Sequence, residues 1–204
     1  MTTVNNDPYI MVRDGVFAKD FCNYCIDKFD RDNRSVVGGV GHGIDLDIKR
    51  SQDLNISILP DWKEEDNLFH EVAQWCIGEY TDHCNDKNPI KSTTPLIHPF
   101  DVQNKGGVIG DSGYQIQRTK PGEGYTWHND GYFNLLEGNR TVTFIFYLNT
   151  VDEGWTQFYN GDQVAPVQGR VVCFPATWTY LHQGYPPKQT KYICTAWICE
   201  RLSR

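Results

Sequence analysis

The stretch KYICTAWICE at residues 191–200 alternates between two kinds of side chain along its whole length. Successive side chains of a β-strand point to opposite faces, so this pattern predicts a strand with two different faces. One face would carry Tyr192, Cys194, Ala196 and Ile198, and the other would carry Lys191, Ile193, Thr195 and Trp197. The first face is apolar, as a core strand requires, but the second includes a lysine. A buried lysine needs a negative partner, which is either a carboxylate of the protein or that of a bound small acid.

Five segments before this strand share its two-residue period, and Gly, Pro, Asn or Asp residues separate them. With the last strand, the expected strands are Tyr114–Arg118, Tyr125–His128, Arg140–Asn149, Thr156–Tyr159, Gly169–Phe174 and Thr190–Glu200. Two earlier segments, residues 18–30 and 61–84, instead carry apolar side chains at helical spacing. Asp61 and Glu64 have the spacing of a capping box at the start of the second helix. Short strands after two helices predict an α+β, mainly β fold, a barrel or jelly roll with the helices packed outside one sheet.

The length and composition of the chain fit one domain. It has 204 residues, of which 39% are apolar and 13% aromatic, enough to bury a core and too many for a disordered chain. No linker or internal repeat divides it. We therefore expect a single domain over residues 1–204, with residues 1–110 as helical lead-in and support and residues 111–200 as the core that carries the site.

The net charge and the N-terminal segment restrict the partners and the cell compartment that we expect for this protein. A net charge of −7 makes a nucleic acid an unexpected partner. No apolar run approaches the roughly 20 residues that a helix needs to cross a bilayer. Residues 1–15 lack the cationic-then-apolar order of a signal peptide. We therefore expect a cytoplasmic protein that has no membrane contact.

The seven cysteines are expected to be free and buried, because their number is odd and most lie within apolar patterns. Cys22 and Cys25 form a CxxC pair, but no second pair completes a zinc set. Phe21, Cys25 and Phe29 recur at helical spacing, which favours a packed helix over a structural zinc site. The glycine-rich segment SVVGGVGHGIDL (residues 35–46) does not fit a phosphate-binding motif and is expected to be a flexible loop.

Three residues have the chemistry and spacing to share a metal ion. His128 and Asp130 are two residues apart, so in a strand their side chains point the same way, and His182 arrives from a later segment. Two histidines and one carboxylate leave other coordination positions open, an arrangement that suits a non-haem Fe(II) activating oxygen. Tyr147 shares a strand face with Thr143, where its hydroxyl could hold the same small acid as the lysine. Alone the HxD pattern is weak, because it occurs by chance and a single histidine is more often structural.

The motifs of residues 112–200 resemble those of the 2-oxoglutarate/Fe(II) dioxygenase superfamily, and within it the prolyl 4-hydroxylase-like branch. That branch shows G-x-x-Y-x-x-H-x-D, a Tyr-Leu-Asn strand, a GG-x-T-x-F strand, a distal His and, nine or ten residues later, a Lys or Arg. The matching residues are Gly122, Tyr125, His128, Asp130, Tyr147, Leu148, Asn149, Gly154, Thr156, Phe158, His182 and Lys191. Thr195 and Trp197 also match a Thr and a Trp that follow the basic residue. Several motifs in the correct order are far more specific than HxD alone.

The resemblance implies a double-stranded β-helix core, of the jelly-roll or cupin-like kind, and a role for each matched residue. His128, Asp130 and His182 would be the metal ligands and the catalytic residues. Lys191 would pair with the distal carboxylate of 2-oxoglutarate, with Lys188 as the next candidate. The other residues of the cosubstrate site would be Tyr147, Thr195, Tyr125 and Trp197. The implied cofactors are Fe(II) and 2-oxoglutarate, with O2 as the oxidant and ascorbate as a reductant.

The chain departs from the family pattern at two positions. Thr119 stands where the family often has a tyrosine, which changes one cosubstrate contact, and Trp155 replaces the second glycine of the GG pair, which changes the rim of the site. Tyr125 and Trp197 also fit packing roles.

The leading hypothesis is an active hydroxylase that modifies a prolyl residue in a peptide or protein, a substrate that family analogy favours. An inactive double-stranded β-helix used as a binding module would predict a broken metal triad or a missing lysine. A structural jelly roll would not explain why Lys191 and Tyr147 both face inward. Trp127, Trp178 and Tyr180 lie near the metal ligands in sequence and could form a substrate wall. The segment Thr94–Gly113 could act as a lid.

Overall fold

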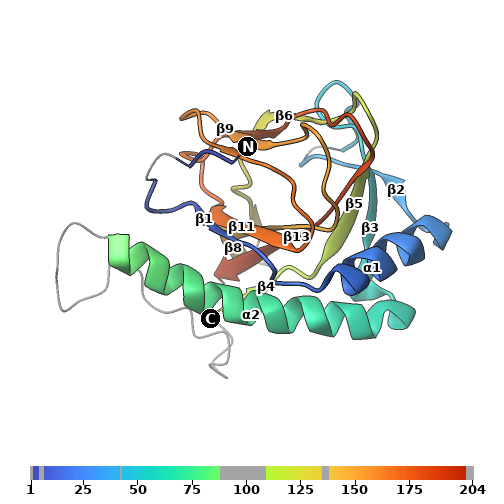
Figure 1. Ribbon diagram of the computed structural model, residues 1–204, viewed down its shortest axis with the longest axis horizontal. Coiled ribbons are helices and arrows are strands. Elements are labelled where there is room, and N and C mark those ends of the chain that lie inside the picture. The colour runs from blue at the N-terminus through green and yellow to red at the C-terminus, as the bar shows by residue number, and fades with distance from the viewer. Residues whose placement is uncertain (1, 5–6, 42, 88–108, 135–137, 201–204) are drawn as a thin grey trace.

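The computed structural model describes residues 2–4, 7–41, 43–87, 109–134 and 138–200 (Figure 1). Two α-helices lie in the first half of the chain, α1 (Lys19–Arg31) and α2 (Lys63–Lys87), and the 3₁₀ turns η1 (Ile56–Ile58) and η2 (Pro60–Trp62) lead into α2. The strands are β1 (Met11–Arg13), β2 (Val36–Val37), β3 (Gln52–Asn55), β4 (Ile109–Asp111), β5 (Gln115–Thr119), β6 (Tyr125–His128), β7 (Phe133–Asn134), β8 (Gly138–Tyr147), β9 (Thr156–Phe158), β10 (Gln163–Val164), β11 (Arg170–Pro175), β12 (His182–Gly184) and β13 (Lys191–Glu200).

The strands form two antiparallel sheets. The large sheet has the order β1-β11-β8-β13-β5-β3-β2, with β4 paired to β13 and β7 paired to β8, and the small sheet has the order β10-β9-β12-β6. From β8 onward the chain passes back and forth between the two sheets, so that β13 comes to lie between β8 and β5. This arrangement is a double-stranded β-helix. The predicted α+β, mainly β fold is confirmed.

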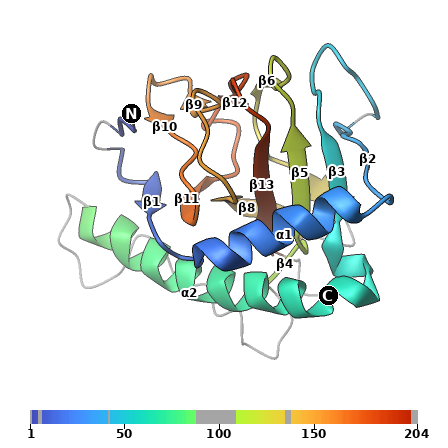
Figure 2. The ribbon, with the colours of Figure 1, turned by 45° about the vertical axis from the view of Figure 1, so that its right-hand side comes forward.

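Both helices cover the face of the large sheet that is turned away from the small sheet (Figure 2). The buried side chains of α1 are Cys22, Cys25 and Phe29. Phe17, just before α1, packs its ring against Phe69 of α2 and Phe146 of β8, with centroid distances of 5.0 and 5.4 Å. Burying an aromatic side chain of this size stabilises a fold by roughly 1.5–3 kcal/mol, so this cluster fixes the helices to the sheet.

A smaller apolar cluster fills part of the space between the two sheets. It consists of Ile10, Ile145, Tyr147, Phe158, Val164, Val172 and Phe174. The imidazole of His182 packs against it, with its ring centroid 4.8 Å from that of Phe174 and 5.9 Å from that of Phe158. The cluster therefore supports one wall of the cavity that occupies the rest of this space.

The sequence located all six of the strands that it predicted, to within two residues at each end. The described residues of the segment 35–46 are mainly loop, as expected, although Val36–Val37 pairs with β3 as strand β2. The capping box is wrong: the Asp61 carboxylate instead accepts hydrogen bonds from Arg34 at 3.0 and 2.7 Å, and Asp61 lies in η2 rather than at the start of α2. Long-range charge pairing has here replaced the local cap.

Other expectations concern less regular parts of the chain. The suggested lid, Thr94–Gly113, lies largely outside the described residues, and residues 109–111 at its end form β4. All seven cysteines are buried, and the described residues contain no disulfide bond, as predicted. Within the described ranges, no helix has the length and apolar character needed to cross a membrane.

Candidate metal and cosubstrate site

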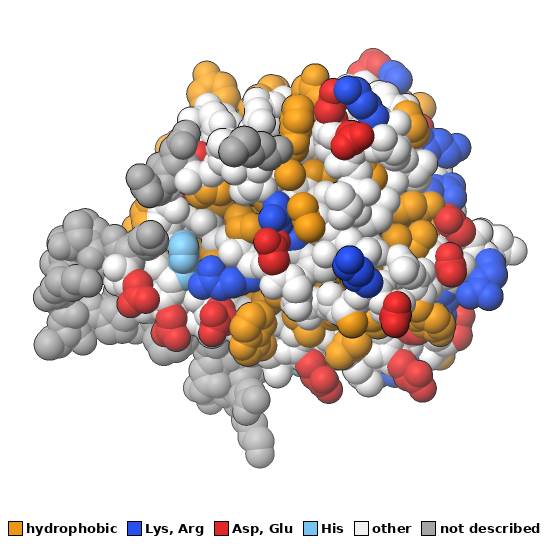
Figure 3. All heavy atoms as spheres, in the orientation of Figure 1, with side chains coloured by type: hydrophobic (Ala, Val, Ile, Leu, Met, Phe, Trp, Pro, Cys, Tyr) orange, Lys and Arg blue, Asp and Glu red, His pale blue; other side chains and the backbone are white. Residues whose placement is uncertain are grey.

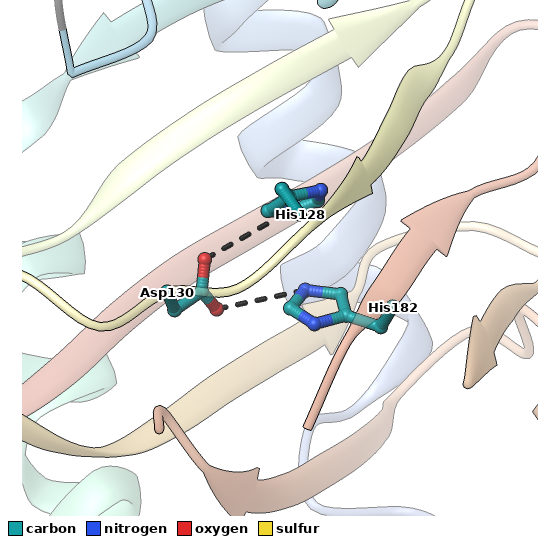
Figure 4. Close-up of side chains that lie close together, drawn as sticks. All are labelled: His128, Asp130 and His182. Atoms are coloured by element: carbon teal, nitrogen blue, oxygen red, sulfur yellow. Dashed lines mark ion pairs between the residues drawn. The ribbon is translucent and has the colours of Figure 1, made fainter. Parts of the chain in front are cut away.

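His128, Asp130 and His182 converge between the two sheets. His128 ends β6, His182 begins β12, and these two strands pair so that the histidines lie directly opposite each other. Figure 4 shows the Asp130 carboxylate pointing toward both imidazoles. Its oxygens lie 3.7 Å from Nε2 of His128 and 3.6 Å from Nε2 of His182. The three ligand atoms lie within 4.8 Å of one another, and in the described part of the chain this is the one such group of His, Cys, Asp or Glu residues.

Backbone and hydroxyl groups orient the three side chains. The Nδ1 atom of His128 lies 2.7 Å from the carbonyl oxygen of Thr126, and Nδ1 of His182 lies 3.0 Å from that of Tyr180. A carbonyl oxygen only accepts, so each Nδ1 carries the proton and each Nε2 presents its lone pair to the shared centre. The hydroxyl of Thr143 donates to Asp130 at 2.8 Å.

The protonation states also suit a cation at this point. Burial, together with the neighbouring His182, lowers the pKa of His128, so that its imidazole is neutral at pH 7. Burial acts to raise the pKa of Asp130, but the two histidines and the Thr143 hydroxyl outweigh it and the net pKa is lowered. Neutral imidazoles and an ionised carboxylate are the forms that bind a metal. The residues present therefore fit an Fe(II) ion of the 2-His-1-carboxylate type.

A cavity of about 530 Å³ extends from these residues along the inner face of the large sheet. The predicted mixed face of β13 lines it, through Lys191, Ile193, Thr195 and Trp197. Thr143 and Ile145 of β8 also line it. The opposite face of β13, with Cys194 among its residues, lies in the core under the helices. The alternation read from residues 191–200 is therefore present in the fold.

Lys191 is buried in this cavity without an acidic partner among the described residues. Only 4% of its surface is exposed, and its Nζ donates to the carbonyl oxygen of Gly154 at 2.8 Å. Burial lowers the pKa of Lys191 to about 8. Lys188, the alternative anchor, instead lies at the surface in an ion pair of 2.7 Å with Glu153. Lys191 is thus a buried cation directed at a cavity, a position that accommodates the carboxylate of a small acid.

The other expected cosubstrate residues differ in how they meet the cavity. Thr195 lines it and accepts a hydrogen bond of 3.2 Å from Gln117. Tyr125 lines it and stacks on His128, with a centroid distance of 3.4 Å and an angle of 11° between the rings. Tyr147 is not among the lining residues: its hydroxyl bonds to that of Thr156 at 2.6 Å, and Thr156 lines the cavity. Tyr147 therefore does not reach the cavity itself, because the side chain of Thr156 lies between them.

Several cavity residues were not singled out from the sequence. Arg140 stacks over Trp197, with its guanidinium carbon 3.7 Å from the ring centroid, and its Nε is buried without a hydrogen-bond partner. Lys49 and Ser51 belong to the segment that leads into β3, and Lys49 pairs with buried Asp53 at 2.6 Å. No local pattern marks these residues, because they come from segments that meet only in the folded chain.

Comparison with known proteins agrees with this geometry. The family model of the 2OG-Fe(II) oxygenase superfamily matches residues 114–199. A search of curated proteins found no match. The part of the chain that holds the metal site and most of the cavity strands is thus similar in sequence to the 2OG-Fe(II) oxygenase superfamily. The resemblance stated from the sequence is confirmed.

Solved structures show the same fold. The viral collagen prolyl hydroxylase vCPH from Paramecium Bursaria Chlorella virus-1, in complex with 2OG, has a TM-score of 0.62 and 18% identity over 96% of this chain and 98% of its own. A Trichoplax adhaerens prolyl hydroxylase, in complex with a hypoxia inducible factor peptide fragment, has a TM-score of 0.70 and 15% identity over 96% and 85%. A Pseudomonas putida prolyl-4-hydroxylase has a TM-score of 0.64 and 16% identity over 94% and 92%.

Proposed function

We propose that this protein is a dioxygenase that hydroxylates a prolyl residue within a peptide or protein, using Fe(II), 2-oxoglutarate and O2, with ascorbate as a reductant. The observation that carries the proposal is the pairing of two features in one cavity. The His-Asp-His group in the lining offers a metal site, and buried Lys191, in the same lining, offers a cation without an acidic partner among the described residues. The two features match the two ends of a 2-oxo dicarboxylic acid that chelates a metal through its oxo-acid end.

The proposed roles follow from the donor atoms. Nε2 of His128, Nε2 of His182 and a carboxylate oxygen of Asp130 would hold Fe(II). When bound, the iron supplies the oxygen chemistry that inserts a hydroxyl group into a substrate C–H bond. The protein orients the two imidazoles through the carbonyls of residues 126 and 180, so that each Nε2 faces the metal position.

Lys191 would bind the distal carboxylate of 2-oxoglutarate. Its present partner, the carbonyl oxygen of Gly154, does not neutralise its charge. The hydroxyl of Thr195 lies on the same strand face and would donate to the cosubstrate as well. Tyr147 would act at one remove, by orienting the hydroxyl of Thr156 toward the cavity.

The preference for a peptide rests on Arg140. Its Nε is a buried donor without a partner, and its guanidinium carbon lies 3.7 Å from the ring centroid of Trp197 and 5.2 Å from that of Tyr132. A carbonyl oxygen of a peptide backbone would satisfy this donor, since a buried unpaired donor costs roughly 1–3 kcal/mol. The related proteins named above as prolyl hydroxylases, one of them with a bound peptide fragment, support the choice of proline.

The test is to incubate the purified chain with Fe(II), 2-oxoglutarate, ascorbate and a panel of proline-containing peptides. Succinate should form in proportion to peptide, and mass spectrometry should find one added oxygen on a prolyl residue. An inactive binding module would release no succinate with any peptide and any reductant. Oxygen added to a residue other than proline would support the proposed dioxygenase activity but refute the proposed substrate.

A further inference from the structure

We propose that Asp7 is a positioning residue for the metal ligand His182 and acts on it through Tyr180. The hydroxyl of Tyr180 donates to the Asp7 carboxylate at 3.0 Å, and Nδ1 of His182 donates to the carbonyl oxygen of Tyr180 at 3.0 Å. Asp7 and Tyr180 are 173 residues apart in the chain, so no local pattern links them. The inference rests on the ligand set of the proposed function, but it concerns a residue outside the lining of the cavity.

The carbonyl groups that orient the two histidines are fixed in different ways. Thr126, the partner of His128, lies inside strand β6. Tyr180, the partner of His182, lies outside any strand, two residues before β12. Its amide donates to the carbonyl oxygen of Thr177 at 3.0 Å, which is a bond within the same loop. A strand therefore fixes the first carbonyl, whereas the second depends on the contacts of a loop.

The side chain of Tyr180 supplies such contacts. The sequence suggested a place for Tyr180 in a substrate wall, but it is not among the residues that line the cavity. Its ring packs against the apolar cluster between the two sheets, and its hydroxyl is bonded to Asp7. The side chain is thus held both at its ring and at its polar end. Because the carbonyl belongs to the same residue, a change in the position of this side chain shifts the acceptor of His182.

Asp7 is a fixed acceptor rather than a mobile surface charge. The oxygen that accepts from Tyr180, Oδ1, also accepts from the amide of Tyr9 at 2.8 Å. The other oxygen, Oδ2, accepts from the side-chain amide of Asn160 at 3.2 Å, in the loop that follows β9. Hydrogen bonds to an ionised carboxylate are stronger than those between neutral groups. Three donors therefore hold Asp7 in one place, and Asp7 in turn holds Tyr180.

The segment around Asp7 is attached to both sheets. Thr3 exchanges backbone hydrogen bonds with Gln163 of β10, in the small sheet, and β1 pairs with β11, in the large one. Figure 1 shows this segment running from the small sheet past β1 to α1. Figure 3, in the same orientation, shows acidic and basic side chains next to one another on this side of the molecule. We call residues 7–14 the strap, and these attachments give Asp7 a rigid base.

Two other contacts of the strap provide matched comparisons, because neither leads to a metal ligand. The hydroxyl of Tyr80, in α2, donates to the carbonyl oxygen of Tyr9 at 3.0 Å. The carboxylate of Asp14 accepts from Arg170 at 2.6 Å. Both contacts attach the strap to the rest of the fold, as the bond from Asp7 to Tyr180 does. A purely structural role of the strap would make all three contacts equivalent for metal binding.

The experiment measures the affinity for Mn(II) by calorimetry and the thermal midpoint of the metal-free protein. Loss of a group that bonds directly to a metal-binding histidine typically costs roughly 10–100-fold in metal affinity. The bond between Asp7 and Tyr180 lies one contact further out, so Tyr180→Phe and Asp7→Ala should each weaken Mn(II) binding by about threefold to tenfold. The double variant should bind no more weakly than Asp7→Ala alone, because both changes break the same bond.

The matched controls are Tyr80→Phe for Tyr180→Phe and Asp14→Ala for Asp7→Ala. Each control removes the same chemical group from another contact of the strap. Both should lower the thermal midpoint, as the test variants do, but leave the Mn(II) affinity unchanged. Tyr180→Phe removes a single oxygen atom and decides the question where Asp7→Ala does not fold.

Wild-type Mn(II) affinity in Tyr180→Phe would overturn the positioning role. Equal weakening by Tyr80→Phe and Asp14→Ala would overturn it too, because the strap would then act on stability alone. A wild type that binds no Mn(II), or binds it equally well after His182→Ala, would refute the ligand set of the proposed function and this inference with it. Mn(II) binding that depends on Asp7, Tyr180 and His182 in a protein that never releases succinate would support the inference and refute the proposed function.

Discussion

The two faces of the large sheet bury different chemistry, although the same strands form both. On the face under α1 and α2, β8 and β13 contribute Phe146, Cys194 and Ile198 to an apolar core. On the face toward the small sheet, the same two strands contribute Thr143 and Lys191 to a cavity. A helix-covered face offers few partners for a polar group, so a polar side chain without one would cost free energy there. Polar residues on the other face therefore indicate a ligand rather than a weak core.

Two buried lysines show the same contrast: one is paired with an acid of the protein, and the other faces the cavity. Lys49 and Lys191 are 5% and 4% exposed. Lys49 pairs with Asp53 at 2.6 Å, and Asp53 also accepts from Ser51 at 2.7 Å. Lys191 has a carbonyl oxygen instead of an acid. Lys49 thus belongs to the fold, and Lys191 is free to bind a ligand.

The largest effect is expected from the metal site. His182→Ala should abolish binding of Mn(II) and all turnover of 2-oxoglutarate, because two ligands do not hold a divalent ion in this geometry. Metal content after dialysis and succinate release measure the two effects. His70→Gln is the matched control, since His70 contacts Asp111 on the helix side of the molecule and should leave both unchanged. Wild-type turnover by the His182 variant would refute the ligand set.

The next largest effect should fall on stability, at Lys49. Lys49→Met leaves the Asp53 carboxylate buried without its cation and should lower the free energy of unfolding by about 3–5 kcal/mol. Urea unfolding of the metal-free protein measures this change. Adding Asp53→Leu to the same chain should recover most of the loss, because an apolar pair can replace a buried ion pair. A Lys49→Met protein as stable as the wild type would contradict the structural role of this pair.

Lys191→Met should weaken 2-oxoglutarate binding without lowering the stability of the fold, the opposite of what is expected for Lys49→Met. Removing a buried cation that has no acidic partner should leave stability unchanged or raise it, while the 2-oxoglutarate concentration for half-maximal turnover rises by at least about tenfold, which corresponds to ~1.4 kcal/mol. The control is Lys188→Ala, which removes an exposed lysine three residues away and should change neither quantity. Loss of stability at Lys191 without a change in 2-oxoglutarate requirement would make it a structural residue like Lys49.

The pH dependence of binding should be smaller and gradual. Burial lowers the pKa of Lys191 to about 8, so below this pH the amine is charged and ready for the carboxylate. As pH rises above about 8 the amine loses its proton, and the affinity for 2-oxoglutarate should fall by about tenfold for each pH unit. Binding measured from pH 7 to 9.5 tests this slope. The Lys191→Met variant should lack it, and an identical slope in that variant would assign the titration to another group.

The sequence predicted those parts of the site that a strand pattern encodes. Residues 191–200 alternate strictly, so the cavity face of β13 was accessible without a structure, and the H-x-D spacing placed two ligands together. Thr156 and Arg140 show what the strand pattern could not predict. Strand period tells which face a side chain occupies but not how deep it lies, so Tyr147 was expected at the cosubstrate and lies behind Thr156. The role of Arg140 depends on its contact with Trp197, a residue 57 positions away in the chain.

The same reasoning explains the errors in the fold. Strands β8 and β13 carry enough residues to show a two-residue period, and β6 and β9 were found although they have only four and three residues. The missed strands β1, β3 and β12 are equally short, and they pair because the rest of the sheet is present, which a local pattern does not reveal. The Asp61 cap was inferred from local spacing, but Arg34, 27 residues earlier, takes its carboxylate. Tertiary contacts determined the outcome in each case.

The central claim, that one cavity joins a metal site to a carboxylate anchor, is tested most directly by titrating 2-oxoglutarate into the protein by calorimetry without oxygen. With Mn(II) present, the wild type should bind one equivalent, and omission of the metal should weaken binding strongly. His182→Ala should lose the effect of the metal, and Lys191→Met should weaken binding by at least about tenfold in its presence. Binding that depends on neither the metal nor Lys191 would contradict the account.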